Sequence, residues 1–273
     1  EGFRVTYLPV DEAGRIQLDA LREALCPETI LVSVMYVNNE VGTVQPIHEA
    51  VQITKRYNSS ILLHTDAVQG YGKYRIYPKR LGIDLLSASG HKIHGPKGVG
   101  FLYIDSRVKI HPIMFGGGQQ RDIRSGTENV PGIAGIGLAS SLIYRDLEMK
   151  TALMRELKAY FIERILQMED TVVHGVTDEE SAPHIISVGV GGVRSEVLLH
   201  TLEDKGICVS SGSACSSNHP AVSGVLKAIG APREYLDATV RFSMSEFTTK
   251  EEIDYTLETL YNCIPMLRKF TRR

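Results

Sequence analysis

Runs of continuous apolar residues alternate with helical patterns in the first half of the chain, and this alternation restricts the possible folds most. The runs have strand-like lengths and are rich in β-branched and aliphatic side chains. The expected strands are residues 5–8, 29–37, 61–64, 83–88 and 99–104. Helical spacing of apolar residues at 18–25 and 46–56 separates them. Strands separated by helices predict an α/β fold with a mostly parallel, doubly wound sheet.

The second half of the chain has a different pattern. A helical stretch from Pro131 to about Met168 contains few breakers in its later part, which predicts one long helix that crosses between two domains. Short strands and helices follow it: strands at 171–173, 185–190 and 238–243, and helices at 195–205, 221–229 and 249–267. This half predicts a smaller α+β domain. We therefore expect one domain over residues 1–146 and a C-terminal domain over 147–273.

Composition and charge exclude several classes of protein. The 43% hydrophobic and 23% charged residues are ordinary for a globular protein with a real core, and the net charge of −2 argues against nucleic-acid binding. No apolar run approaches the ~20 residues that a membrane helix needs. The four cysteines have no metal-site spacing, and the start of the chain does not resemble a signal peptide. We expect no metal site and a location in the reducing cytoplasm.

Lys92 and Asp66 form the first candidate constellation. Lys92 follows the expected strand 83–88 and precedes a Gly/Pro-rich loop, so a rigid element holds its amine while one side stays open for Schiff-base chemistry. Ser89 and His91 beside it are suited to hold a phosphate. Asp66 follows the strand 61–64, where open α/β sheets place ligand groups, and its carboxylate suits a cationic nitrogen. A loop lysine and a turn or N-cap aspartate are the alternatives, but the pair together is what pyridoxal phosphate requires.

Cys215 and Arg241 are the candidates in the second half. Cys215 lies among small, polar residues (SSGSACSSNHP, 210–220), which suits a mobile nucleophile. Cys208 lies on an expected strand at 207–209, and we interpret it as structural, as we do Cys26 and Cys263. Arg241 interrupts an apolar strand and therefore needs an anionic partner, either a substrate carboxylate or a structural ion pair.

Six motifs occur in one order: NNEVGTVQP (38–46), HTDAVQ (64–69), SASGHKIHGPKGVG (87–100), RSGTENVPG (124–132), SSGSACSS (210–217) and VRFS (240–243). By these motifs the chain resembles the NifS/IscS-type cysteine desulfurases, a class V aminotransferase-like group of fold-type I pyridoxal-phosphate enzymes. The resemblance spans essentially the whole chain. It implies a fold-type I large domain, of which residues 1–146 form the C-terminal part. It also implies a small C-terminal domain, 147–273, that carries the catalytic cysteine loop.

The resemblance implies a role for each matching residue. The residues implied to bind pyridoxal 5′-phosphate are Lys92 (Schiff base), Asp66 (pyridinium nitrogen), Gln69 (ring hydroxyl), Ser89 and His91 (phosphate) and Thr127 (phosphate, across a dimer interface). Asn39 and Arg241 are implied to hold the substrate carboxylate. Lys92 and Cys215 are implied to be catalytic, with Cys215 accepting sulfur as a persulfide.

The implied activity is removal of sulfur from L-cysteine, giving L-alanine and an enzyme persulfide that a sulfur-acceptor protein, such as an iron–sulfur scaffold, takes over. A homodimer is implied. The chain departs from the family in two ways. It lacks the family's N-terminal portion, which carries a phosphate-binding turn and a ring-stacking histidine, and Ser245–Glu246 stands where many relatives have Gly-Arg. Two alternatives stay open: a selenocysteine lyase or related β-eliminating lyase, and an inactive fragment or interaction subunit.

Overall fold

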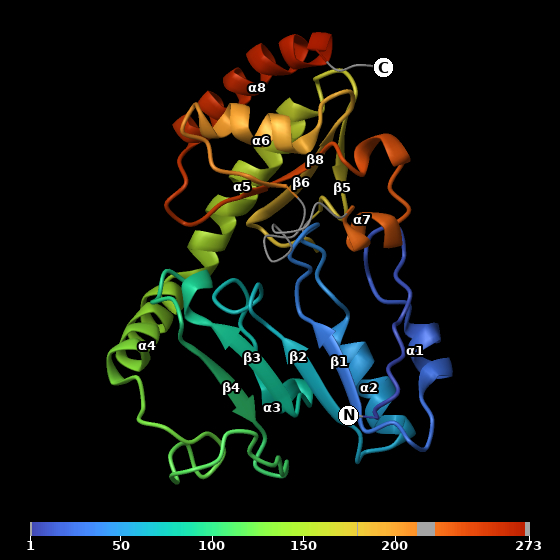
Figure 1. The fold of residues 1–273 in the computed structure, drawn as a ribbon, viewed down its shortest axis with the longest axis vertical. Coiled ribbons are helices and arrows are strands. Elements are labelled where there is room, and N and C mark those ends of the chain that lie inside the picture. The colour runs from blue at the N-terminus through green and yellow to red at the C-terminus, as the bar shows by residue number, and fades with distance from the viewer. Residues whose placement is uncertain (1, 179, 212–221, 271–273) are drawn as a thin grey trace. The chain divides into compact units, whose positions relative to one another are not determined.

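A computed structural model describes residues 2–178, 180–211 and 222–270, which form two compact units (Figure 1). Unit 1 comprises Glu1–Gln17, Val37–Val44 and Glu148–Arg273, and unit 2 comprises Leu18–Tyr36 and Gln45–Leu147. By their contacts, two segments of the first half therefore belong with the C-terminal residues. The assignment of 1–146 and 147–273 to a cofactor-binding domain and a cysteine-carrying domain stays a prediction.

Unit 2 contains a four-stranded sheet in the order β1-β2-β3-β4. Its elements are α1 (Leu18–Ala24), β1 (Leu31–Met35), α2 (Ile47–Tyr57), β2 (Leu62–Asp66), α3 (Pro78–Leu81), β3 (Leu85–Ser89), the 3-10 turn η1 (Gly90–Lys92), β4 (Gly100–Ile104) and α4 (Val130–Tyr144). Strands β1, β2 and β3 are parallel, and β4 is antiparallel to β3. The prediction of an α/β fold with a mostly parallel sheet is confirmed.

The sheet of unit 2 is buried on one face only. Along each of β1 to β3 buried residues alternate with exposed or half-buried ones, as the two-residue period of a strand requires. The buried face carries Val32, Val34, Leu63, Thr65, Leu86 and Ala88. The other face carries polar residues near the carboxyl ends of the strands. Helix α2, which contacts β2, buries its own apolar side.

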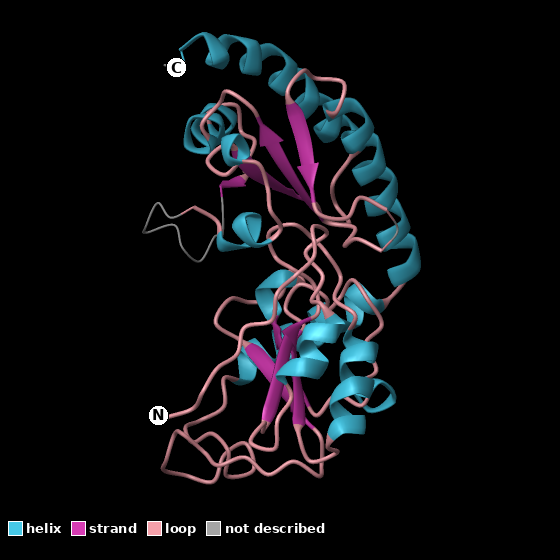
Figure 2. Ribbon diagram, turned by 90° about the vertical axis from the view of Figure 1, so that its right-hand side faces the viewer, coloured by secondary structure: helices cyan, strands magenta, loops and turns pink. Residues whose placement is uncertain are grey.

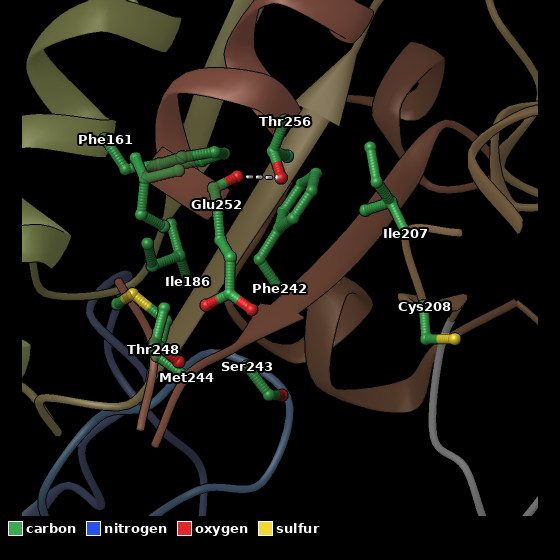
Figure 3. Close-up of a pocket in the computed structure, with 11 residues that line it drawn as sticks. Phe161, Ile186, Ile207, Cys208, Phe242, Ser243, Met244, Thr248, Glu252 and Thr256 are labelled. Atoms are coloured by element: carbon green, nitrogen blue, oxygen red, sulfur yellow. Dashed lines mark hydrogen bonds between the residues drawn. The ribbon is translucent and has the colours of Figure 1, made fainter. Parts of the chain in front are cut away.

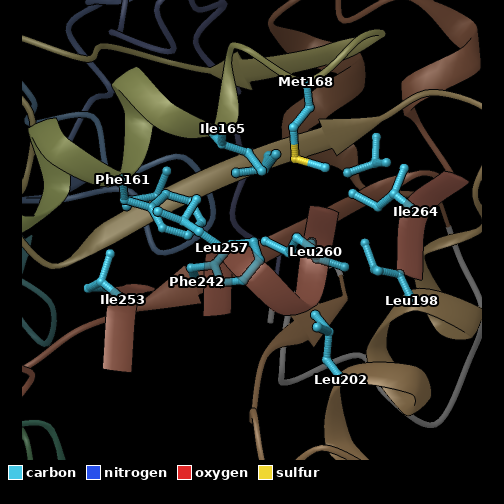
Figure 4. Packing of buried hydrophobic residues seen from close by; sticks show 14 of the residues in the cluster. Phe161, Ile165, Met168, Leu198, Leu202, Phe242, Ile253, Leu257, Leu260 and Ile264 are labelled. Atoms are coloured by element: carbon cyan, nitrogen blue, oxygen red, sulfur yellow. The ribbon is translucent and has the colours of Figure 1, made fainter. Parts of the chain in front are cut away.

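Unit 1 contains an antiparallel sheet in the order β5-β6-β8-β7. Its elements are α5 (Leu147–Ile165), β5 (Thr171–His174), β6 (Ile185–Val190), α6 (Ser195–Glu203), β7 (Ser210–Ser211), α7 (Gly224–Ala228), the 3-10 turn η3 (Arg233–Tyr235), β8 (Thr239–Ser243) and α8 (Lys250–Phe270). Figure 2 distinguishes its helices and strands. Side chains from α5, α6, α8, β6 and β8 form one hydrophobic core (Figure 4).

Three sequence-based expectations about local structure were wrong. The single helix from Pro131 to Met168 is two helices, because Arg145 is extended and Asp146 has a positive φ of 55°, a conformation that aspartate tolerates better than most residues. Residues 5–8 form no strand, because no neighbouring strand pairs with them in the described part of the chain. Cys208 is exposed rather than buried and precedes the short strand β7, whereas Cys263 is buried as expected.

No helix among the described residues is both long enough and apolar enough to cross a membrane.

Candidate functional site

The carboxyl ends of β1, β2 and β3 meet at one edge of the sheet in unit 2. The register pairs Met35 with Asp66 and Asp66 with Ser87, so Asp66 ends β2 beside the last residue of β1 and the third residue of β3. Ser89 ends β3 two residues after Ser87. Polar groups from separate segments thus lie at the edge where parallel sheets place their ligands.

The turn after Asp66 orients its carboxylate. Asp66 Oδ1 accepts a hydrogen bond from the Val68 amide over 2.9 Å. Gln69 lies half-buried on the same turn, and Gly70 follows it. A Cβ on Gly70 would lie 2.8 Å from the Tyr36 ring, so only glycine allows the turn to pack against Tyr36.

Lys92 lies on a short, well-anchored turn. The Gly90 amide donates to the Val99 carbonyl and the Gly95 amide to the Gly90 carbonyl, each over 2.9 Å. Ile93, the next residue after Lys92, is 2% exposed and packs on Ile136, Ala139 and Ile143. Half-buried Lys92 is thus held between a strand end and a hydrophobic cluster.

Ser89 and His91 contact one another in this structure. Ser89 Oγ lies 2.6 Å from His91 Nδ1. When the imidazole donates from Nδ1, the hydroxyl oxygen accepts and its own proton is available to an anion. Two residues that the resemblance assigns to a phosphate therefore already act as a pair.

A histidine to which the sequence analysis gave no role lies on the same face of the sheet. His64 Nδ1 lies 2.8 Å from Ser33 Oγ on β1, and Nε2 lies 2.9 Å from Ser87 Oγ on β3. Burial lowers the pKa of His64, while the carboxylate of Asp66 acts weakly in the opposite direction. The sequence signal was the recurrence of polar residues at alternate positions of otherwise apolar strands.

Tyr144 fastens the segment that follows Gln69. Its hydroxyl accepts from the Gly72 amide over 3.1 Å and donates to the Tyr74 carbonyl over 3.2 Å. Burial raises the pKa of Tyr144 to about 12. Gly72, with φ at 77°, packs so closely on Ile93 that a Cβ would lie 2.5 Å from that side chain. The Asp66 turn and the Lys92 turn are therefore packed together.

Four of the predicted site residues are not found among the described residues at this edge of the sheet. Thr127 is exposed on the separate loop between β4 and α4. Cys215 lies outside the described residues. Asn39 and Arg241 belong to unit 1.

Asn39 and Arg241 contact each other within unit 1. Arg241 Nη1 donates to the Asn39 carbonyl oxygen over 2.7 Å, and Nη2 donates to Ser210 Oγ over 3.3 Å. The Asn38 side chain accepts from the Glu40 and Val41 amides and shapes the turn. Ser223 at the start of α7 donates to the Glu40 carboxylate over 2.5 Å. A guanidinium beside a fixed turn is a suitable place for a carboxylate.

Unit 1 also contains a pocket that none of the predicted site residues lines (Figure 3). Its walls include Phe161, Ile186 and Phe242, with Glu252 and exposed Cys208 among the other lining residues. Its volume of about 170 Å³ is well below the ~300 Å³ at which ligand pockets usually begin. We therefore do not assign the site to this pocket.

Comparison with known proteins identifies relatives over nearly the whole chain. Residues 1–256 match the family described as aminotransferase class-V. The chain is 43% identical to a cysteine desulfurase IscS of Dictyoglomus turgidum over 98% of its own length and 67% of the relative's. It is 42% identical to a mitochondrial cysteine desulfurase of Eremothecium gossypii over 99% of its length and 55% of the relative's. A solved NifS-like protein superposes with a TM-score of 0.90 at 36% identity, over 97% of this chain and 69% of that one. The chain thus spans between about half and two thirds of the length of these relatives.

Proposed function

The chain belongs to the aminotransferase class-V family, and on this premise we propose that it is a pyridoxal-phosphate-dependent cysteine desulfurase. The proposed reaction converts L-cysteine to L-alanine and leaves the sulfur on the protein as a persulfide. The names of the relatives favour this activity over selenocysteine cleavage.

The residues at the sheet edge of unit 2 fit the polar groups of pyridoxal phosphate. Asp66 would hold the cationic ring nitrogen, and Gln69 on the next turn would hold the ring hydroxyl. The Ser89–His91 pair would donate to the phosphate, and Lys92 Nζ would bond to the aldehyde carbon. One observation carries the proposal: an acid, a hydroxyl–imidazole pair and an amine lie on consecutive strand ends and turns of one anchored edge.

Bound there, pyridoxal phosphate supplies an electron-withdrawing ring that stabilises negative charge on the α-carbon of an amino acid. Arg241 and Asn39 would hold the cysteine carboxylate. Lys92 Nζ, released when the amine of the substrate takes its place, would take the proton from the α-carbon and later return it. The Cys215 thiolate would attack the substrate sulfur, so that a sulfur–sulfur bond forms and the carbon–sulfur bond breaks. The β-carbon keeps that electron pair and takes up a proton, which gives alanine and a persulfide on Cys215.

The proposal extends to partners and location. An acceptor protein, such as an iron–sulfur scaffold, would take the sulfur from Cys215. A homodimer would let Thr127 of one protomer reach the cofactor phosphate of the other. We propose a reducing compartment, the cytoplasm, because the reaction needs free thiols. A relative named as mitochondrial shows that the family is not restricted to the cytoplasm.

The test is loading of the purified chain with pyridoxal phosphate, followed by borohydride reduction and peptide mapping. We expect the label on Lys92, and we expect Lys92→Ala to lower alanine formation from L-cysteine by about 10²-fold or more. Cys215→Ser should abolish persulfide formation.

Each variant has a matched control within the chain. Lys97 lies five residues beyond Lys92 on the same loop and is exposed, so Lys97→Ala should leave labelling and turnover unchanged. Cys208 is the exposed thiol nearest in sequence to Cys215 among the described cysteines, so Cys208→Ser should keep the persulfide. Label on Lys97, or full desulfuration by Cys215→Ser, would contradict the assignment.

A further inference from the structure

His64 joins three strands through one ring. Ser33 is its register partner on β1, and Ser87 lies on β3 two residues beyond the partner position Leu85. The ring reaches both hydroxyls, over 2.8 Å and 2.9 Å. A neutral imidazole has one donor and one acceptor nitrogen, and a serine hydroxyl can fill either role, so this bridge satisfies the neutral ring completely.

The surroundings of His64 disfavour the protonated ring. Among the described residues neither ring nitrogen is bonded to a carboxylate. The charged group that acts on the ring is Asp66 on the same strand, and burial outweighs its effect, so the pKa of His64 is lowered. Its other neighbours in the bridge, Ser33 and Ser87, carry no charge.

His64 also has a defined position relative to Asp66. The two residues are separated by one position on β2, so both side chains point to the same face, about 7 Å apart along the strand. An imidazolium at that distance would offset part of the negative charge of the Asp66 carboxylate. A neutral ring leaves that charge to whatever cation binds at the end of the strand.

We propose that His64 is a positioning residue for Asp66: the neutral imidazole, bridging Ser33 and Ser87, fixes the carboxyl ends of three parallel strands and leaves the Asp66 charge to the cofactor's ring nitrogen. This inference rests on the proposed function, because it assumes that pyridoxal phosphate binds at this edge. It assigns a role to a residue that contacts neither cofactor nor substrate.

The first measurement needs no cofactor. Nitrogen-15 resonances of the histidine rings, recorded on the full chain from about pH 7.5 to about pH 5.5, report protonation and tautomer. The His64 signal, assigned by its loss in His64→Gln, should still report a mainly neutral ring at about pH 6.5, the ordinary pKa of a histidine side chain. A His64 ring that is already half protonated at or above about pH 6.5 would overturn the neutral bridge.

The second measurement concerns the cofactor. The dissociation constant of pyridoxal phosphate and the nitrogen-15 shift of its ring nitrogen are compared for wild type, His64→Gln and His64→Phe. Phenylalanine fills the same space without hydrogen bonds, so we expect about tenfold weaker binding and a less protonated ring nitrogen. Glutamine retains a neutral donor and acceptor and should restore binding to within about threefold of wild type.

Acidification separates an electrostatic role from a merely structural one. When the pH is lowered far enough to protonate His64, the affinity of the wild type for pyridoxal phosphate should fall further than that of His64→Gln, because only the wild type acquires a cation beside Asp66. The proposal would be overturned by an equal loss of cofactor affinity in wild type and His64→Gln on acidification. It would also be overturned by a His64→Phe variant with unchanged cofactor affinity and a fully protonated ring nitrogen of the cofactor.

Two controls complete the design. His174→Gln replaces another histidine whose pKa is lowered by burial, on β5 of unit 1, and should leave cofactor affinity unchanged. Wild-type chain that takes up no pyridoxal phosphate would overturn the proposed function and the role of His64 toward the ring nitrogen. The cofactor-free spectra would then still decide whether the neutral bridge exists.

Discussion

The two sheets of the molecule use their faces differently. In unit 1, all six residues of β6 are buried, and β8 beside it is mostly buried. In unit 2, strands β1 to β3 bury every second residue and carry Ser33, His64 and Asp66 on the opposite face. The comparison shows that the two sheets have different roles, and we refer to this difference as the division of labour. The antiparallel sheet supplies packing, and the parallel sheet supplies polar groups at strand ends.

The largest effect is expected in the core of unit 1. Phe161 is 1% exposed, and its ring lies 4.9 Å from that of Phe242. Phe161→Ala should lower the free energy of unfolding by about 3–5 kcal/mol, measured by urea denaturation. Phe247, which is 69% exposed, is the control, and its alanine variant should change stability by less than about 0.5 kcal/mol. Equal losses in both variants would contradict the division of labour.

The second effect concerns a buried charge in unit 1. Lys158 Nζ donates to Ser181 Oγ and to the Ala182 carbonyl, each over 2.8 Å, and burial lowers its pKa to about 8. The unfolded chain holds this proton up to about pH 10.5, so between about pH 8 and 10.5 the unfolded state binds more protons than the folded one. The free energy of unfolding should therefore gain up to about 3 kcal/mol from this residue as pH rises through that window.

Lys158→Met should remove this gain. Calorimetry or urea denaturation at a series of alkaline pH values measures the slope, and exposed Lys269, replaced in the same way, serves as the control. If the free energy of unfolding of Lys158→Met rises with pH as steeply as that of the wild type, Lys158 is not the source of the gain.

A smaller effect on stability, with a functional readout, is expected in unit 2. Tyr144→Phe leaves the buried Gly72 amide without its acceptor, which should lower the free energy of unfolding by about 1–2 kcal/mol. Because the same contact fastens the turn after Gln69, cofactor affinity should fall as well. Tyr77→Phe, at a residue that is 48% exposed, should change neither quantity. Loss of stability with unchanged affinity would confine Tyr144 to packing.

The smallest effect is expected at the surface of unit 1. Arg15 and Glu180 form an ion pair, but the Glu180 side chain is 73% exposed. Glu180→Gln should change the free energy of unfolding by less than about 0.5 kcal/mol, and added salt should reduce even that difference. A larger change would mean that unit 1 depends on its surface as well as on its core.

Local patterns predicted the elements of the sheets well, because buried strands need apolar side chains wherever they lie. The expected strands 29–37, 61–64 and 83–88 overlap β1, β2 and β3, with ends that differ by one or two residues. The break at Asp146 was missed, because a single left-handed residue leaves little trace in the spacing of apolar side chains.

The candidate site likewise contains residues that the sequence predicted and contacts that it did not. Asp66, Ser89 and Lys92 were recognisable because each lies at the end of a strand or shortly beyond it. The bridge made by His64 depends on strand order and register, which no local pattern specifies. The contact between Arg241 and Asn39 joins residues 202 positions apart, and only the folded chain shows it.

That separation has a consequence for the newly made protein. At about 5–20 residues per second, synthesis reaches Arg241 about 10–40 s after Asn39 has been made. Val41 is 1% exposed in the folded unit, where it packs with Leu226 and Ile229. For most of that interval these two residues have not yet been made, so they cannot cover Val41. Leu147, the last residue of unit 2 in this chain, is made well before Leu226 and Ile229, so the 37–44 segment still awaits the residues that bury it when unit 2 has been made. During that time Val41 would be exposed on a loop whose covering residues have not yet been made, and ribosome-associated chaperones would have access to it.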